Sequence, residues 1–116
     1  MKIIHVITDT NFGGAGRYLL YLIPRPAFHD HEVLVACPEG ELQMRLDAAN
    51  IKRLPIVSGK DISHSPRLTK ELIDLFRAEK PDLVHTHGCL SGRIAGRLLK
   101  IPVVYTKHGQ VRTGGE

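Results

Sequence analysis

Residues 2–17 read Lys-Ile-Ile-His-Val-Ile-Thr-Asp-Thr-Asn-Phe-Gly-Gly-Ala-Gly-Arg, and this stretch decides the fold class of the chain. An apolar run leads into a glycine cluster, and a leucine-rich stretch with helical spacing follows directly. A strand, a glycine turn and a helix in this order leave backbone N–H groups unpaired at the helix N-terminus, where they can hold an anionic phosphate. The segment therefore predicts the first unit of an α/β sheet and one wall of a ligand site.

The same alternation of short apolar runs and helical segments continues along the chain. It predicts strands at 2–8, 31–37, 51–57, 83–86 and 103–106, and helices at about 15–23, 42–49, 66–76 and 91–99. Strands separated by helices imply βαβ units and a parallel sheet, for which right-handed crossovers favour the Rossmann-like, doubly wound order 3-2-1-4-5. The tail 110–116 carries no pattern. We therefore predict that the fifth strand leaves an open edge, through which the chain self-associates.

Composition excludes several classes of protein. The 116 residues suffice for one small domain, and 42% apolar with 24% charged content is typical of a globular protein. The net charge of +4 comes from scattered Lys and Arg residues, and aromatics make up only 5%, which argues against a nucleic-acid binder. This charge remains compatible with anionic substrates and with a weak attraction to the inner face of a membrane.

The two cysteines and the N-terminus indicate the compartment. Cys37 and Cys89 lie far apart with no CxxC pair, so we expect neither a disulfide framework nor a thiolate metal site. We predict no transmembrane helix, because the sequence has no long uninterrupted apolar run. We also predict no signal peptide, because charged and polar residues interrupt the N-terminal segment within ten positions. The expected location is the cytoplasm.

In the predicted sheet, three loops meet at the carboxyl ends of the strands, where such sheets bind ligands: residues 11–16, 87–90 and 107–110. Glycines at 13, 14 and 16 let the backbone approach a bulky ligand. Leu19 stands where a dinucleotide fingerprint would have its third glycine, and no Gly-Lys-Ser/Thr of a P-loop follows. The glycines could also form a plain turn between strand and helix, and Arg17 could either reach a phosphate or cover the helix surface.

The histidines are the other candidates for chemistry. His85 and His87 alternate on a strand and so share one face, and we expect Cys89 to continue that parity. His87 and His108 stand at strand ends beside glycines, where a side chain can meet a ligand. We interpret His85 and His5 as structural, and His29, His31 and His64 as solvated. A metal held by His85, His87 and His108 is an alternative, but no acidic residue follows in the loop and we expect no metal.

Three motifs in order give the chain a resemblance to a known family. They are Ile4-His-Val-Ile-Thr-Asp with Phe12-Gly-Gly-Ala-Gly-Arg17, Pro81-Asp-Leu-Val-His-Thr-His-Gly88, and Val104-Tyr-Thr-Lys-His-Gly109. From Met1 to about Gly109 the chain resembles the N-terminal, acceptor-side domain of family 4 glycosyltransferases. The resemblance implies a GT-B enzyme with two Rossmann-like domains across a cleft. Such enzymes move a hexose from a nucleotide-sugar to a carbohydrate or lipid-linked acceptor, retain the anomeric configuration, and need no metal or other cofactor.

The resemblance also implies roles for individual residues. The glycine loop approaches the donor diphosphate and the acceptor, His108 contacts the donor sugar at the reacting centre and is the expected catalytic residue, and His87 and Gly88 line the acceptor side. The expected substrate-binding residues are Gly13, Gly14, Ala15, Gly16, Arg17, His87, Gly88 and Gly109. Residues 1–116 would form part of the N-terminal domain without the nucleotide-gripping C-terminal lobe, and would be inactive alone. Two alternatives remain, a non-catalytic nucleotide- or phosphate-binding module and the histidine-based metallohydrolase.

Overall fold

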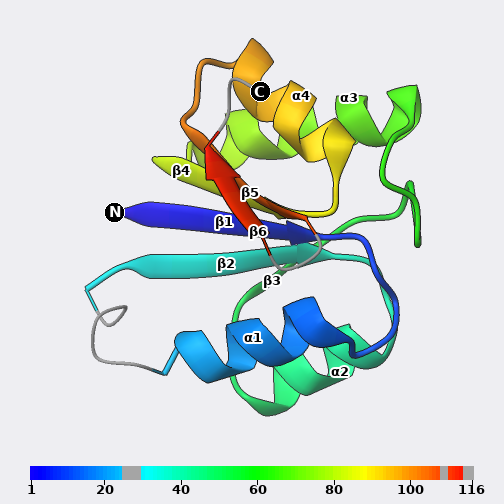
Figure 1. The fold of residues 1–116 in the computed structure, drawn as a ribbon, viewed down its shortest axis with the longest axis vertical. Helices are drawn as coiled ribbons and strands as arrows, with labels where there is room; N and C mark the ends of the chain where they lie inside the picture. Colours follow the sequence, from blue (N-terminus) through cyan, green and yellow to red (C-terminus); the bar gives the residue numbers. More distant parts are fainter. Residues whose placement is uncertain (25–29, 108–109, 114–116) are drawn as a thin grey trace.

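The computed structural model describes residues 1–24, 30–107 and 110–113. Strands and helices alternate along the chain until the fifth strand, and a sixth strand follows it (Figure 1). The elements are β1 (Lys2–Ile7), α1 (Gly14–Leu22), β2 (Glu32–Cys37), α2 (Glu41–Ala48), β3 (Arg53–Pro55), α3 (Pro66–Glu79), β4 (Leu83–His87), α4 (Leu90–Leu98), β5 (Val103–Lys107) and β6 (Gln110–Thr113). Among these described helices, none combines the length and apolar character needed to cross a membrane.

The predicted parallel sheet is confirmed. The strand order is β3-β2-β1-β4-β5-β6, and every pair from β3 to β5 is parallel. The central pair aligns Ile3 with Leu83, His5 with His85 and Ile7 with His87. Winding therefore reverses between β1 and β4, and the carboxyl ends of these two strands lie next to each other. The third strand is shorter than the predicted 51–57, since it begins at Arg53 and ends at Pro55.

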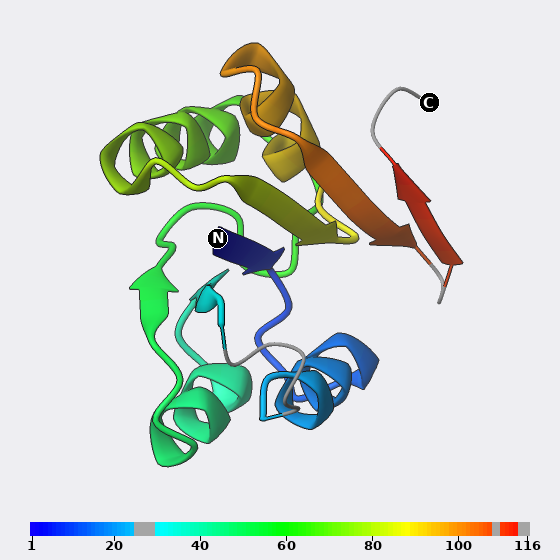
Figure 2. The ribbon, with the colours of Figure 1, turned by 90° about the vertical axis from the view of Figure 1, so that its left-hand side faces the viewer.

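The prediction for the tail is wrong. Residues 110–113 form β6, which pairs antiparallel with β5 from Val104↔Thr113 to Lys107↔Gln110 (Figure 2). The N–H and C=O groups along the outer edge of β5 thus form hydrogen bonds with β6 of the same chain. Because β6 pairs with it, the β5 edge is not open, and it gives no ground to expect self-association through this strand.

Two helices cover each face of the sheet (Figures 1 and 2). On one side α3 and α4 bury an apolar core under a stripe of Leu68, Leu72 and Phe76. Ser65 caps α3 by accepting a hydrogen bond from the Leu68 amide at 3.0 Å, and Pro66 occupies the first helical position, as predicted. On the other side α1 and α2 bury a second cluster around Leu19, Val35 and Leu46. Cys37 and Cys89 are free and buried in different clusters.

Candidate functional site

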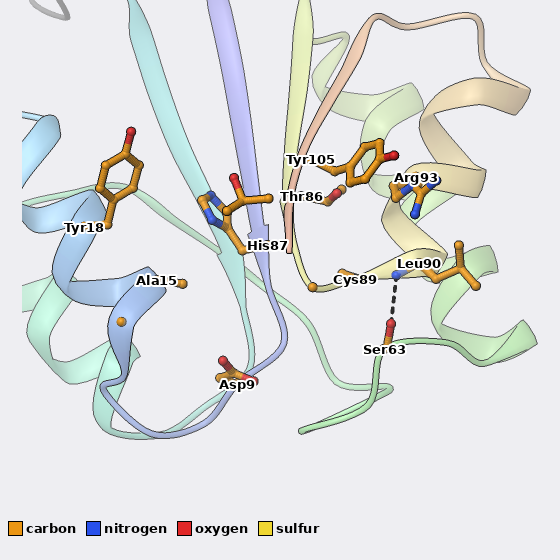
Figure 3. A pocket seen from close by; sticks show the side chains of 13 residues that line it. Asp9, Ala15, Tyr18, Ser63, Thr86, His87, Cys89, Leu90, Arg93 and Tyr105 are labelled. Atoms are coloured by element: carbon orange, nitrogen blue, oxygen red, sulfur yellow. Dashed lines mark hydrogen bonds between the residues drawn. The ribbon is translucent and has the colours of Figure 1, made fainter. Parts of the chain in front are cut away.

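A cleft of about 830 Å³ opens at the carboxyl ends of β1, β4 and β5, between α1 and α4 (Figure 3). Five segments contribute its walls: the β1–α1 loop, α1, the β3–α3 loop, the β4–α4 segment and β5. The lining residues are Asp9, Gly14, Ala15, Tyr18, Ser63, Thr86, His87, Gly88, Cys89, Leu90, Arg93, Tyr105 and Thr106. This is the crevice at which doubly wound sheets bind ligands.

The N-terminus of α1 faces this cleft. Gly13 is its N-cap and makes no side-chain cap hydrogen bond, and no acidic residue stands in the first turn. A methyl group added at Gly14 would meet no atom within 4 Å. The N-terminal end of α1 therefore presents backbone donors and the positive end of the helix dipole to the cleft, which favours an anion by about 0.3–1 kcal/mol.

Side chains from other elements hold the loop that leads into α1. Asp61 accepts hydrogen bonds from the Thr10 amide at 2.8 Å and from the Thr10 hydroxyl at 3.0 Å. Glu41 accepts one from the Phe12 amide at 3.2 Å. Both carboxylates thus bind loop groups that would otherwise bond to water. The turn is fixed by its neighbours before any ligand arrives.

The N-terminus of α4 points to the same cleft but is already satisfied. The Leu90 amide donates to the Ser63 hydroxyl at 3.1 Å (dashed in Figure 3), and the Ser91 amide donates to the Ser63 carbonyl at 3.0 Å. On the same wall the Arg93 guanidinium lies 3.8 Å from the centroid of the Tyr105 ring. The two helix ends therefore differ, and α1 has the donors that remain available to an anion.

Gly88 redirects the chain where β4 ends. Its φ of +64° is a left-handed conformation that a side chain would strain. The turn carries Cys89 to the opposite face of the sheet, where it packs in the core beneath α3 and α4. The expectation that Cys89 continues the parity of His85 and His87 is wrong for this reason, although the residue still contributes to the cleft wall.

Three histidines gather on the α1 side of the sheet. His85 and His87 stack at 4.3 Å between ring centroids, as their alternation predicts, and His5 joins them from β1 at 5.0 and 5.3 Å. His5 Nδ1 lies 3.1 Å from His87 Nε2, and His85 Nε2 lies 2.8 Å from the Thr106 hydroxyl. His5 is buried, while His85 is only half-buried.

Burial controls the charge of this cluster. It lowers the pKa of His87 to about 3, with a further contribution from the neighbouring His85 ring. Burial, then repulsion from His85 and His87, lowers the pKa of His5 well below its usual value, and burial also lowers the pKa of His85. All three rings are therefore neutral at pH 7, and in the close pair one nitrogen donates to the other.

The structure brings together some of the predicted site residues and not others. Gly14, Ala15, His87 and Gly88 line the cleft. Gly13, Gly16 and Arg17 are absent from its wall. Gly13 caps α1. Gly16 is a packing residue, because an added methyl group would lie 2.8 Å from Leu42 Cδ1. The Arg17 guanidinium instead lies 5.0 Å from the centroid of the Phe12 ring. His108 and Gly109 lie outside the described residues.

Several residues that line the cleft were not predicted from the sequence. Tyr18 lies one helical turn beyond Gly14 and Ala15, so a helical wheel could have placed it beside them. Asp9 directly follows the predicted first strand, and this position at the carboxyl end of a strand could have placed it at the cleft. Ser63 lies in a polar loop that nothing local connects to α4. Thr86 precedes His87 on β4 and so points to the opposite face of the sheet, yet it also lines the cleft. Its buried hydroxyl has no hydrogen-bond partner among the described residues.

Comparison with solved structures finds the same fold in larger proteins, one of which is named as a glycosyltransferase. A glycosyltransferase from Rickettsia africae matches with a TM-score of 0.72 at 20% identity, over 92% of this chain and 29% of its own. Anabaena HepE, solved with UDP and glucose, matches at 0.68 and 20%, over 90% and 29%. MurG of Acinetobacter baumannii matches at 0.69 and 20%, over 90% and 34%. The chain thus spans about a third or less of each of these structures.

Comparison by sequence is more specific. No match was found among curated proteins. The family model described as Glycosyltransferase Family 4 matches residues 12–115, a range that includes the α1 glycines, the β4–α4 segment and β5. This match covers most of the chain, and with the shared GT-B fold it shows that the chain belongs to glycosyltransferase family 4.

Proposed function

We propose that this chain supplies the acceptor-side half of the active site of a retaining hexosyltransferase. The enzyme would move a sugar from a nucleotide-sugar donor to a carbohydrate or lipid-linked acceptor. One observation supports this above the others: the family match covers α1, the β4–α4 segment and β5, which the fold brings together at the cleft. The function thus rests on sequence and geometry that agree at the same residues.

The donor diphosphate would bind at α1. The N-terminus of that helix has uncapped donors and an exposed glycine, whereas the first amides of α4 already bond to Ser63. Anabaena HepE was solved with UDP and glucose, and we infer the same ligand class here. The backbone of Gly14 and Ala15 would contact the diphosphate, and the cationic Arg93 on the far wall would add to the attraction.

His87 would orient the sugar. His5 engages Nε2 of its ring, which leaves Nδ1 for a sugar hydroxyl, and Gly88 leaves space beside it. A neutral ring can make this bond at any pH above the lowered pKa of His87. We keep His108 as the catalytic residue and Gly109 as a substrate contact on the family resemblance alone. Gly13 and Gly16 would then shape the turn rather than contact substrate.

The isolated chain should not turn over substrate. Transfer requires donor and acceptor to be held together, and a second lobe across the cleft would supply the remaining contacts. The chain covers only 29% of the Rickettsia and Anabaena structures. We therefore expect weak binding and no measurable transfer by residues 1–116 alone.

A titration followed by amide NMR tests the binding site. Addition of UDP-glucose to the chain should shift the amide signals of Gly14, Ala15 and Gly88 first, at millimolar ligand. The shift should weaken in His87→Gln and remain in the control His64→Gln, which alters an exposed histidine. Signals that move only elsewhere, or an unchanged response in His87→Gln, would contradict the assignment.

Turnover tests the chemistry. Fusion of the chain to the C-terminal lobe of a family 4 glycosyltransferase should give sugar transfer, with NMR of the product showing a retained anomeric configuration. His108→Ala should then lower kcat by at least about 100-fold, because a group at the reacting centre is worth that much or more. Micromolar binding by the chain alone, with no transfer by the fusion, would instead indicate a non-catalytic binding module.

A further inference from the structure

We propose that His5, His85 and His87 form a binding site for one divalent transition-metal ion of the zinc class. Each residue offers one ring nitrogen, and the three nitrogens lie within 4.8 Å of one another. This site shares His87 with the proposed sugar site, but its occupant would be a metal ion and not the sugar. It also differs from the metallohydrolase hypothesis, because β1 supplies the third histidine in place of His108.

The sheet sets the arrangement of the ligands. His85 and His87 form a His-x-His pair on β4, and the parallel register places His5 directly beside His85 on β1. Three imidazoles from two adjacent strands on one face are a donor set of the kind that binds Zn²⁺ and leaves a fourth position open. Register, and not a mobile loop, therefore determines how close the rings are.

One nitrogen–nitrogen distance already suits the ion, and the remaining ring nitrogens, all within 4.8 Å, would move closer on binding. Zn–N bonds of about 2.0–2.1 Å in a tetrahedron put ligating nitrogens about 3.3 Å apart. His5 Nδ1 and His87 Nε2 are already 3.1 Å apart, so an ion can replace the hydrogen bond between them. The Thr106 hydroxyl holds Nε2 of His85 at 2.8 Å and leaves Nδ1 of that ring for the metal. An oxygen on the outer nitrogen is the usual support of a ligating histidine.

The surroundings select the type of ion. The group contains nitrogen ligands and no carboxylate, which suits Zn²⁺, Co²⁺, Ni²⁺ or Cu²⁺ and not Mg²⁺ or Ca²⁺. His5 and His87 are 5% and 8% exposed, so the site is shielded from bulk water. Because His87 also lines the cleft, the open coordination position would face the cleft side of the cluster.

Calorimetry with metal salts tests the proposal on the whole chain after treatment with EDTA. Zn²⁺ should bind with one equivalent, Mg²⁺ should give no heat, and Co²⁺ should give visible absorption bands of a low-coordinate site. His85→Gln should weaken Zn²⁺ binding by more than about 100-fold, since even outer-shell partners are worth about 10–100-fold. The matched control is His31→Gln, which removes the ring 3.2 Å from the N-terminal amine and should leave binding unchanged.

The unaltered chain provides a second readout that does not depend on how the variant folds. Zn²⁺ should shift the imidazole NMR signals of His5, His85 and His87 together, at one equivalent. No stoichiometric binding, binding that survives in a folded His85→Gln chain, or shifts confined to other histidines would each overturn the proposal.

Discussion

Acid should unfold this protein through its buried histidines. Burial lowers the pKa of His87 to about 3, while the unfolded chain restores a value near 6.5. The unfolded state then binds the extra proton, so stability is complete above about pH 6.5 and falls as the pH drops toward 3. Between pH 7.5 and pH 5 His87 alone should lower the free energy of unfolding by about 2 kcal/mol. His5 and His85 act in the same direction. For a domain stable by about 5–15 kcal/mol this loss is large.

Urea unfolding at pH 7.5 and pH 5.0, followed by circular dichroism in EDTA, measures the effect. The unaltered chain should lose at least about 2 kcal/mol between the two conditions, and His87→Gln should lose about 2 kcal/mol less. His64→Gln removes an exposed ring and should behave like the unaltered chain. If His87→Gln shows the same pH dependence as His64→Gln, His87 is not held neutral in the fold and the reasoning is refuted.

Two further predictions concern packing and capping. Gly92→Ala should cost about 1 kcal/mol in urea unfolding, because its methyl group would lie 2.7 Å from Thr86 Cγ2. The matched Gly14→Ala meets no atom and should not lower stability; equal losses in both would contradict the packing argument. Ser65→Ala should cost about 1 kcal/mol, since Leu68 loses its capping acceptor, while Ser65→Asn should retain most of it.

The parts of the fold that local sequence determines were predictable. The α3 stripe, its proline at the first turn, and the alternation of strands and helices all follow from spacing within a few residues. The strand order followed from general rules of chirality. The β6 strand could not be predicted this way. Residues 110–113 carry no apolar pattern of their own, and they form a strand because the edge of β5 offers hydrogen-bond partners.

The site was predictable to the extent that topology alone assembles it. The two loops that follow β1 and β4 had to meet, and Gly14, Ala15, His87 and Gly88 met with them. Ser63 was not predictable, because its contact with the first amides of α4 joins segments 27 residues apart. The turn at Gly88 was visible as a glycine, but its left-handed φ, which moves Cys89 to the other face, was not.

The register of β1 on β4 connects the cleft with the histidine cluster. His5 faces His85 in the ladder, and from there its Nδ1 reaches Nε2 of His87. A shift of one residue would turn His5 to the other face of the sheet and leave the His87 nitrogen buried without this partner. The same register puts Ile7 beside His87 and brings the β1–α1 turn level with the end of β4. One alignment thus supports the proposed phosphate site and the proposed metal site, and a substitution that disturbs it should weaken the binding of both ligands.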